Sequence, residues 1–241
     1  MTAAAATWPA EWLQDTVHAL SEPEVWRGVE TQYASSSLQL VDSHAEHDVL
    51  EQLLEASKPP LPDGAPRGQH FLLSTPFRYT PGQGSRFRAA GSLGIWYGAR
   101  ELKAACAEVA YWRMRFILDS VGLLQRRITT HHTFFMAVVR GSGIDLTAPP
   151  WDTFASAWTS GSDYTETQRL AAAVQAAGIE VIQYASVRAP GGTCFAVFTP
   201  AALRQPRGGI DRTRQKWTCT ATRERVLMAQ DGGPGRWEWD G

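Results

Sequence analysis

Three arginines and two tyrosines gather in one short polar stretch of the chain. Arg78, Arg86 and Arg88 lie within eleven residues, and Tyr79 and Tyr97 flank them. A guanidinium can fork onto phosphate or carboxylate oxygens, and tyrosine offers a flat face on which a ring can stack. The spacing therefore favours a loop that binds an anion. Three surface arginines on an ordinary loop would have the same spacing, so that alternative stays open.

A second candidate is Glu108, on a helix predicted from about residue 100 to residue 119. On a helical wheel, Glu108 lies about 90° from the centre of an apolar stripe. At this edge a carboxylate is partly desolvated and still reaches a cleft. Pairing of an edge glutamate with an arginine such as Arg115 is the alternative, and the pattern does not decide between them. The stripe consists of Leu102, Ala105, Val109, Trp112 and Phe116.

Ser186 stands near the end of a strand predicted over residues 179–188, just before Arg188 and a glycine turn. Loops that follow strands often carry functional residues, but ordinary polar caps occur there too. Ser186 is therefore a candidate that the pattern alone does not settle.

The elements that position these residues mix helices and strands without regular alternation, which favours the α+β class over a doubly wound sheet. We predict residues 1–69 to be an N-terminal helical extension packed on a core formed by residues 70–241. Its second helix starts at Ser43 and Glu46, which have capping-box spacing, and ends before the Pro- and Gly-rich residues 58–68. Helices are expected over 9–20, 43–57, 100–119 and 165–177, and strands over 70–79, 93–98, 128–140, 179–188, 193–200 and, as a pair, 216–230.

Composition and missing motifs exclude several classes of function. The net charge is −1 and the arginines are dispersed, so the clustered positive field that nucleic-acid binding needs is not expected. Three distant cysteines, no basic and apolar leader, and no long apolar run indicate a cytoplasmic protein without a membrane helix. No Walker loop, HExxH, GxSxG or dinucleotide glycine fingerprint occurs. His131 and His132 point to opposite faces of a strand without a third ligand, so we expect no metal site.

Taken in order, these pieces resemble the RES domain family, which is named for an Arg, a Glu and a Ser. The likeness covers about residues 70–200 and runs through TPFRY (75–79), SRFRAAGSLGIWYGARELKAACAEVAYWR (85–113) and LAAAVQAAGIEVIQYASVRAPGGTCFAVF (170–198). By this match the signature residues are Arg86, Tyr97, Glu108 and Ser186, and Arg78 resembles an upstream arginine. The family usually has Gly-Arg-Trp where this chain has Ser-Arg-Phe, so Arg88 is a second candidate for the signature arginine.

The resemblance implies an ADP-ribosyltransferase-like split β-sheet core with surrounding helices, and an activity that consumes NAD⁺ as a substrate without a metal. Glu108 would then stabilise the reacting ribose, Arg86 with Arg78 would hold the pyrophosphate or orient the nicotinamide end, and Tyr97 would stack on a ring. Ser186 would hydrogen-bond the ribose or the amide. Tyr79, Arg88 and Arg188 would complete the NAD⁺ site.

Many family members are toxins of bacterial toxin–antitoxin pairs. A cognate antitoxin with a helix-turn-helix is therefore an expected partner, and a homodimer stays open. Two other functions remain as alternatives: transfer of ADP-ribose to a protein, and a non-catalytic module that binds a partner.

Overall fold

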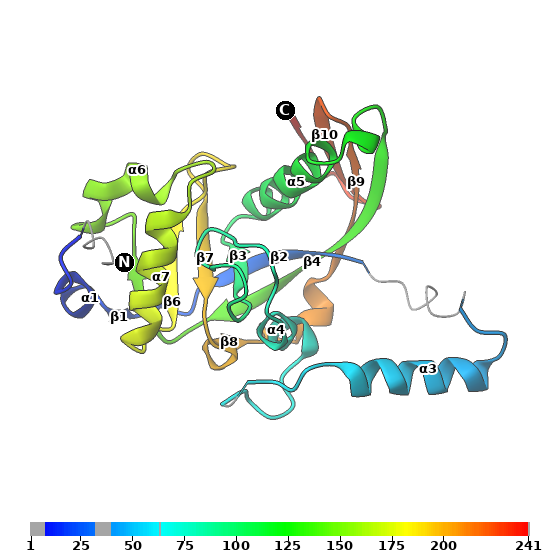
Figure 1. The fold of residues 1–241 in the computed structure, drawn as a ribbon, viewed down its shortest axis with the longest axis horizontal. Coiled ribbons are helices and arrows are strands. Elements are labelled where there is room, and N and C mark those ends of the chain that lie inside the picture. The colour runs from blue at the N-terminus through cyan, green and yellow to red at the C-terminus, as the bar shows by residue number, and fades with distance from the viewer. Residues whose placement is uncertain (1–7, 32–39, 63, 241) are drawn as a thin grey trace.

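The computed structural model of the chain describes residues 8–31, 40–62 and 64–240. It confirms the mixed α+β class, because the eleven strands in the described residues form one sheet with several helices around it (Figure 1). The order along the sheet is β1-β5-β6-β7-β3-β2-β4-β9-β10-β11, with β8 paired to β4. The strands are β1 (His18–Ala19), β2 (Glu24–Glu30), β3 (Trp96–Ala99), β4 (Ile128–Val139), β5 (Ser142–Asp145), β6 (Val181–Ala185), β7 (Thr193–Val197), β8 (Leu203–Arg204), β9 (Gln215–Ala221), β10 (Arg225–Gln230) and β11 (Arg236–Asp240).

The strand β2 lies in the middle of the sheet, although the sequence predicts only helices before residue 70. It pairs antiparallel with β4 from Glu24↔Val138 to Glu30↔His132. Its partner on the other side is β3, which it meets at the single register pair Trp26↔Ala99. A seven-residue strand this short carries little periodicity, and its place is determined by partners far along the chain.

The helix predicted over 9–20 is limited to the single turn α1 (Trp12–Asp15). Thr16 ends it by donating its hydroxyl to the carbonyl of Trp12 at 2.7 Å, and the chain then enters β1. The edge strand β1 pairs with β5 through His18↔Gly143. Pairing with a distant strand therefore overrides the local helical pattern here.

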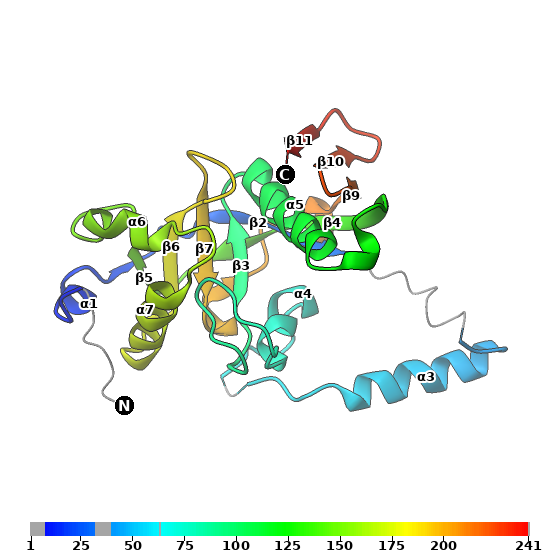
Figure 2. The same cartoon turned by 45° about the horizontal axis from the view of Figure 1, so that its top comes forward.

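The helix α3 (His44–Ser57) begins and ends where the sequence predicts. The hydroxyl of Ser43 accepts the N–H of Glu46 at 3.2 Å, which is the expected cap. The helix does not pack on the core, however: none of its residues is buried, and Val49, Leu53 and Leu54 are exposed. It extends away from the body of the protein in both ribbon views (Figures 1 and 2).

The segment expected as a strand over 70–79 is helical instead. It forms the short helix α4 (Phe71–Ser74) and a 3₁₀ turn, Thr75–Arg78. Leu73 and Phe77 are both fully buried, and their spacing of four residues places them on one face of a helix. Pro76 also lacks the N–H that a central strand would donate. The strand prediction for this segment was therefore wrong.

The helix α5 (Leu102–Leu118) carries Glu108, as predicted, but buries a different face. Its buried side is rich in alanine, with Ala104, Ala107 and Ala110 each 1% exposed, whereas Trp112 and Phe116 of the expected stripe are 48% and 51% exposed. Small side chains let the helix approach the sheet closely. The two aromatic rings are thereby left free to line a cleft.

The remaining elements agree with their predicted types, and successive residues on the strands pack on opposite faces of the sheet. Phe134 belongs to the core on the α5 side, and Phe135 belongs to the core that also contains Leu73 and Phe77. The other helices are α6 (Ala155–Trp158) and α7 (Thr165–Ala176), and further 3₁₀ turns cover Val121–Leu123, Trp151–Phe154, Pro200–Ala202 and Ile210–Thr213. Within the described ranges, no helix has both the length and the apolarity to cross a bilayer.

Candidate functional site

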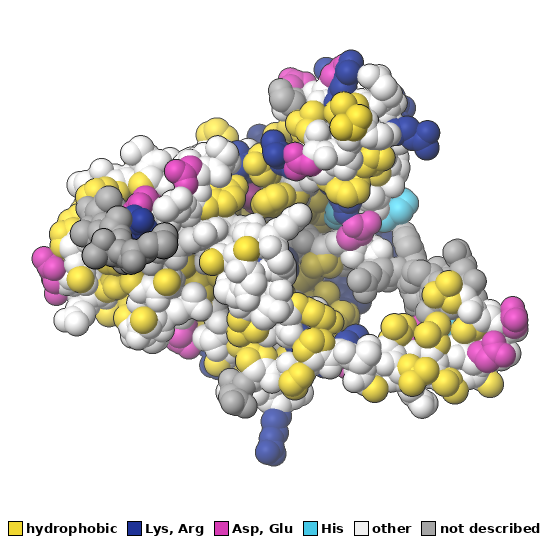
Figure 3. All heavy atoms as spheres, in the orientation of Figure 1, with side chains coloured by type: hydrophobic (Ala, Val, Ile, Leu, Met, Phe, Trp, Pro, Cys, Tyr) yellow, Lys and Arg dark blue, Asp and Glu magenta, His cyan; other side chains and the backbone are white. Residues whose placement is uncertain are grey.

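A cleft of about 1200 Å³ opens beside the point where β2 and β3 part. It is visible in Figure 3 as the hollow below the lobe that carries α5 and β9. Its walls come from β2, β3, the outer face of α5 and the loop between residues 79 and 95. The sequence-predicted residues that line it are Tyr79, Arg86, Arg88, Tyr97, Glu108 and Arg188.

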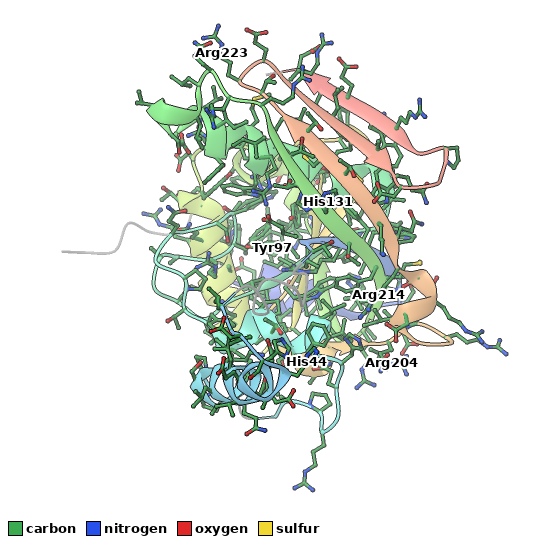
Figure 4. All side chains as sticks on the ribbon, turned by 90° about the vertical axis from the view of Figure 1, so that its right-hand side faces the viewer. His44, Tyr97, His131, Arg204, Arg214 and Arg223 are labelled. Atoms are coloured by element: carbon green, nitrogen blue, oxygen red, sulfur yellow. The ribbon has the colours of Figure 1, made fainter. Side chains whose placement is uncertain are left out.

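Tyr97 lies on β3 and holds the polar loop against the sheet. Its hydroxyl is 2.9 Å from the hydroxyl of Ser85 and accepts the backbone N–H of Phe87 at 3.1 Å. Figure 4 shows Tyr97 in the middle of the molecule. Burial raises the pKa of the phenol, so this group stays protonated. Close packing at Gly94 fixes the other end of the loop, because a Cβ there would lie 1.8 Å from the carbonyl oxygen of Pro76.

Arg86 is buried at one end of the cleft. Its Nη1 donates to the carbonyl oxygens of Trp158 and Ser160, both at 2.9 Å. Its guanidinium also lies 5.0 Å from the ring centroid of Tyr164. By contrast, Arg88 donates to the carbonyl of Pro81 in an exposed contact. The geometry therefore favours Arg86 as the signature arginine, while its role stays a prediction.

Glu108 faces Arg86, Arg188 and Ser186 from the side of α5. Burial raises the pKa of its carboxyl, and the charges of Arg188 and Arg86 and a hydrogen bond with Ser186 oppose this shift in part. The buried hydroxyl of Ser186 accepts the N–H groups of Arg188 at 3.3 Å and Ala189 at 3.1 Å. Its proton is therefore available to the Glu108 carboxylate. Ser186 therefore hydrogen-bonds to Glu108 but does not itself line the cleft.

Arg188 is fixed by two contacts that the sequence pattern does not show. Its guanidinium carbon lies 3.4 Å from the ring centroid of Tyr111, and its Nη2 donates to the carbonyl of Gly161 at 2.7 Å. Tyr111 and Tyr164 both line the cleft. The sequence interpretation did not assign Tyr164 to the site, and no local motif marks it. The two tyrosines and the arginines Arg86 and Arg188 enclose the end of the cleft next to Glu108.

Arg78 does not line the cleft, although its neighbour Tyr79 does. Its Nε donates to the carbonyl of Pro59 at 2.6 Å, and its Nη1 lies 3.4 Å from a carboxylate oxygen of Glu55. These contacts tie the segment after α3 to the 3₁₀ turn that carries Arg78. The structure therefore does not bring Arg78 together with the other predicted site residues.

A different arginine, Arg27 of β2, enters the cleft instead. Its Nη1 donates to the carbonyl of Tyr97 at 2.8 Å, and its guanidinium carbon is 5.3 Å from the ring centroid of Trp96. The sequence interpretation missed Arg27 because it lies 70 residues before Tyr97, between the two helices expected over 9–20 and 43–57. A lone arginine in a short strand has no local signal of function.

Metal-binding side chains do not gather in the described part of the chain: it contains no group of three His, Cys, Asp or Glu placed to hold an ion. His132 lines the cleft, but burial lowers the pKa of its imidazole to about 4. Its Nε2 lies 2.9 Å from the hydroxyl of Thr130. The chemistry that the cleft offers is therefore that of one half-buried carboxylate beside fixed guanidinium groups and aromatic rings.

Comparison with known proteins identifies a family and solved structures of similar fold. A model of the RES domain family matches residues 62–222. Among solved structures, the chain is similar to the crystal structure of the M. tuberculosis MbcT-MbcA toxin-antitoxin complex, with 13% sequence identity and a TM-score of 0.49. That similarity covers 89% of this chain and 92% of the other. No curated protein matches.

Proposed function

Because the chain belongs to the RES domain family, we propose that it consumes NAD⁺ by breaking the bond between nicotinamide and ribose. We further propose that its sheet is of the ADP-ribosyltransferase-like split type. The single register pair between β2 and β3, with the cleft beside it, supports this arrangement. The activity would be that of a glycohydrolase or a phosphorylase, with water or phosphate as the acceptor.

The observation that carries the proposal is the environment of Glu108. The carboxylate is half-buried in the cleft, and its neighbours are the guanidinium groups of Arg86 and Arg188 and the hydroxyl of Ser186. Burial of a carboxylate strengthens its attraction for a positive charge that develops nearby. Cleavage of an N-glycosidic bond passes through an oxocarbenium-like state with such a charge on the ribose.

In the proposed reaction, the bond between the ribose C1 and the nicotinamide nitrogen breaks, and nicotinamide leaves with the electron pair. Glu108 stabilises the ribosyl cation and holds a ribose hydroxyl. The acceptor oxygen then bonds to C1, and when the acceptor is water its proton passes to solvent. Arg86 and Arg188 hold Glu108 and the polar groups of the substrate in place, and Tyr111 or Tyr164 offers a face for the nicotinamide ring.

The test is Glu108→Gln, which keeps the shape of the side chain and removes its charge. NAD⁺ and its products would be followed by chromatography with the purified protein, in buffer with and without phosphate. We expect the variant to lose about 10²-fold or more in kcat. The matched control is Glu224→Gln, which removes the same charge from an exposed turn outside the cleft. Equal rates for wild type and Glu108→Gln would refute the mechanism.

Two other functions give different results in the same assay. A protein ADP-ribosyltransferase would leave label from adenine-labelled NAD⁺ on protein, whereas the proposed activity releases it as free ADP-ribose or its phosphate ester. A non-catalytic module would leave NAD⁺ intact. The retention of Arg86, Tyr97 and Glu108 around one cleft favours an enzyme over such a module.

We also propose that the chain is the toxin of a toxin–antitoxin pair, an inference that rests on its family. A cognate antitoxin with a helix-turn-helix would cover the cleft. Controlled expression in a bacterial host should then lower cellular NAD⁺ and stop growth, and Glu108→Gln should do neither. Normal growth with a folded wild-type protein at high level would contradict this role.

A further inference from the structure

Arg27 is held rigidly at the point where the central strands part. Its Nη1 is fixed by the carbonyl of Tyr97 at 2.8 Å, and the guanidinium lies over the fully buried ring of Trp96. Two constraints on one flexible side chain remove most of the rotamer entropy that binding a ligand would otherwise cost. Arg27 is therefore a pre-organised donor in the cleft.

The positive charge of Arg27 has no matching negative charge among the described residues. Its Nε is buried and has no hydrogen-bond partner. Burial lowers the pKa of the guanidinium to about 10, and no carboxylate contributes to that shift. A buried charge without a partner destabilises a fold. Such a group therefore points to a function that needs it.

Most of the other arginines of the cleft lie near a carboxylate, and Arg88 donates to the carbonyl of Pro81 in an exposed contact. Arg113 pairs with Glu30, and Arg86 and Arg188 both lie close enough to Glu108 to lower the pKa of its carboxyl. The arginine that the sequence assigned to the pyrophosphate, Arg78, is outside the cleft and bound to the segment after α3. Arg27 is then a half-buried cleft arginine with a buried, unpartnered Nε and no described carboxylate that balances its charge.

From this geometry we propose that Arg27 binds the diphosphate group of a nucleoside diphosphate or dinucleotide. The inference rests on the proposed function in one respect, that NAD⁺ is the dinucleotide concerned. In NAD⁺ the diphosphate is one ribose away from the bond to nicotinamide. Arg27 pairs in register with Phe135 and so lies on the face of the sheet away from α5. A ligand that reaches both Arg27 and Glu108 would therefore pass the gap beside the β2–β3 register pair, and both residues line the same cleft. A guanidinium fork suits the paired oxygens of a diphosphate.

This assignment extends the site into a part of the chain that the family match does not include. The match begins at residue 62, whereas β2 covers Glu24–Glu30. A residue from outside the matched segment would thus complete the substrate site.

The experiment compares binding of ADP and adenosine by calorimetry, using wild type, Arg27→Gln, Arg27→Lys and the control Arg223→Gln. Arg223 is exposed and lies far from Tyr97 in Figure 4. We expect Arg27→Gln to weaken ADP binding at least tenfold and adenosine binding less than twofold, with Arg27→Lys intermediate. The control should bind both as wild type does.

Thermal unfolding separates this role from a merely structural one. Arg27→Gln removes an unbalanced charge together with the hydrogen bond to Tyr97 and the contact with Trp96, so these effects offset one another. Its midpoint without ligand should stay within a few degrees of that of wild type, while the increase produced by ADP should disappear. Equal ADP binding by wild type and Arg27→Gln, parallel loss of ADP and adenosine binding, or no ADP binding by wild type would each overturn the proposal.

The same variants distinguish failure of this inference from failure of the proposed function. If wild type binds ADP through Arg27 but leaves NAD⁺ intact, the diphosphate site stands and the proposed reaction is wrong. If wild type consumes NAD⁺ and Arg27→Gln has an unchanged KM, the reaction stands and the role of Arg27 is refuted.

Discussion

The replacement Tyr97→Phe should detach the polar loop from the sheet while it leaves the aromatic ring in place. The hydroxyl makes contacts of 2.9 Å with Ser85 and 3.1 Å with the N–H of Phe87. Each such hydrogen bond contributes about 1 kcal/mol net, and the Phe87 N–H left without a partner adds a further cost. We therefore expect a loss of about 2 to 3 kcal/mol in the free energy of unfolding.

For a chain of this size, that loss corresponds to a fall of roughly 4 to 12 °C in Tm. The measurement is calorimetric unfolding together with hydrogen exchange at the Phe87 amide. The control is Tyr79→Phe, which removes the hydroxyl of an exposed side chain and should change stability by less than about 0.5 kcal/mol. If Tyr97→Phe unfolds within that same margin of wild type, and protection at Phe87 is unchanged, then the hydroxyl does not hold the loop.

Three further replacements test other parts of the structure. Gly94→Ala should lower the free energy of unfolding by more than about 3 kcal/mol, because its Cβ would lie 1.8 Å from the Pro76 carbonyl oxygen. Gly82→Ala, which has open space around it, should change the free energy of unfolding by less than about 0.5 kcal/mol; urea unfolding measures both. The raised pKa of Glu108 means that the free energy of unfolding falls as pH rises from about the ordinary value of 4.5 through the folded-state pKa. The free energy of unfolding of Glu108→Gln should lack this fall with pH. Identical dependence of the free energy of unfolding on pH in wild type and Glu108→Gln would contradict the prediction. Arg78→Gln should change the KM for NAD⁺ by less than about twofold, since the partners of Arg78 do not line the cleft. A much larger increase in KM would show that Arg78 contributes to the substrate site.

Local patterns were sufficient for the elements whose signals lie within a few residues. The cap of Ser43 and Glu46 located the start of α3, and helical periodicity located the helix that carries Glu108. The same periodicity failed to identify the buried side of α5. Alanine carries a weak hydrophobic signal, and the large rings of Trp112 and Phe116 dominated the pattern although they line the cleft.

Long-range pairing determined the features that the sequence did not reveal. Arg27 and Tyr97 meet only because β2 lies next to β3, and no spacing rule connects residues 70 apart. Arg78 resembled a site residue by its neighbours in sequence, but the exposed helix α3 and the segment after it supplied Glu55 and Pro59 as competing partners. Of the predicted arginines, Arg86, Arg88 and Arg188 therefore line the cleft, whereas Arg78 does not.

The central position of β2 also bears on how the chain assembles during synthesis. Thr31, just after β2, contacts Thr133 of β4, 102 residues later. At about 5–20 residues per second, the ribosome needs on the order of 5–20 s to make that interval. For about the first 70 of these residues β2 has neither neighbour, because β3 is made next and β4 only later. Contacts between such distant segments also form slowly. Because the cleft requires β2, β3 and Arg188 together, a nascent chain cannot bind its ligand until most of its length has been translated.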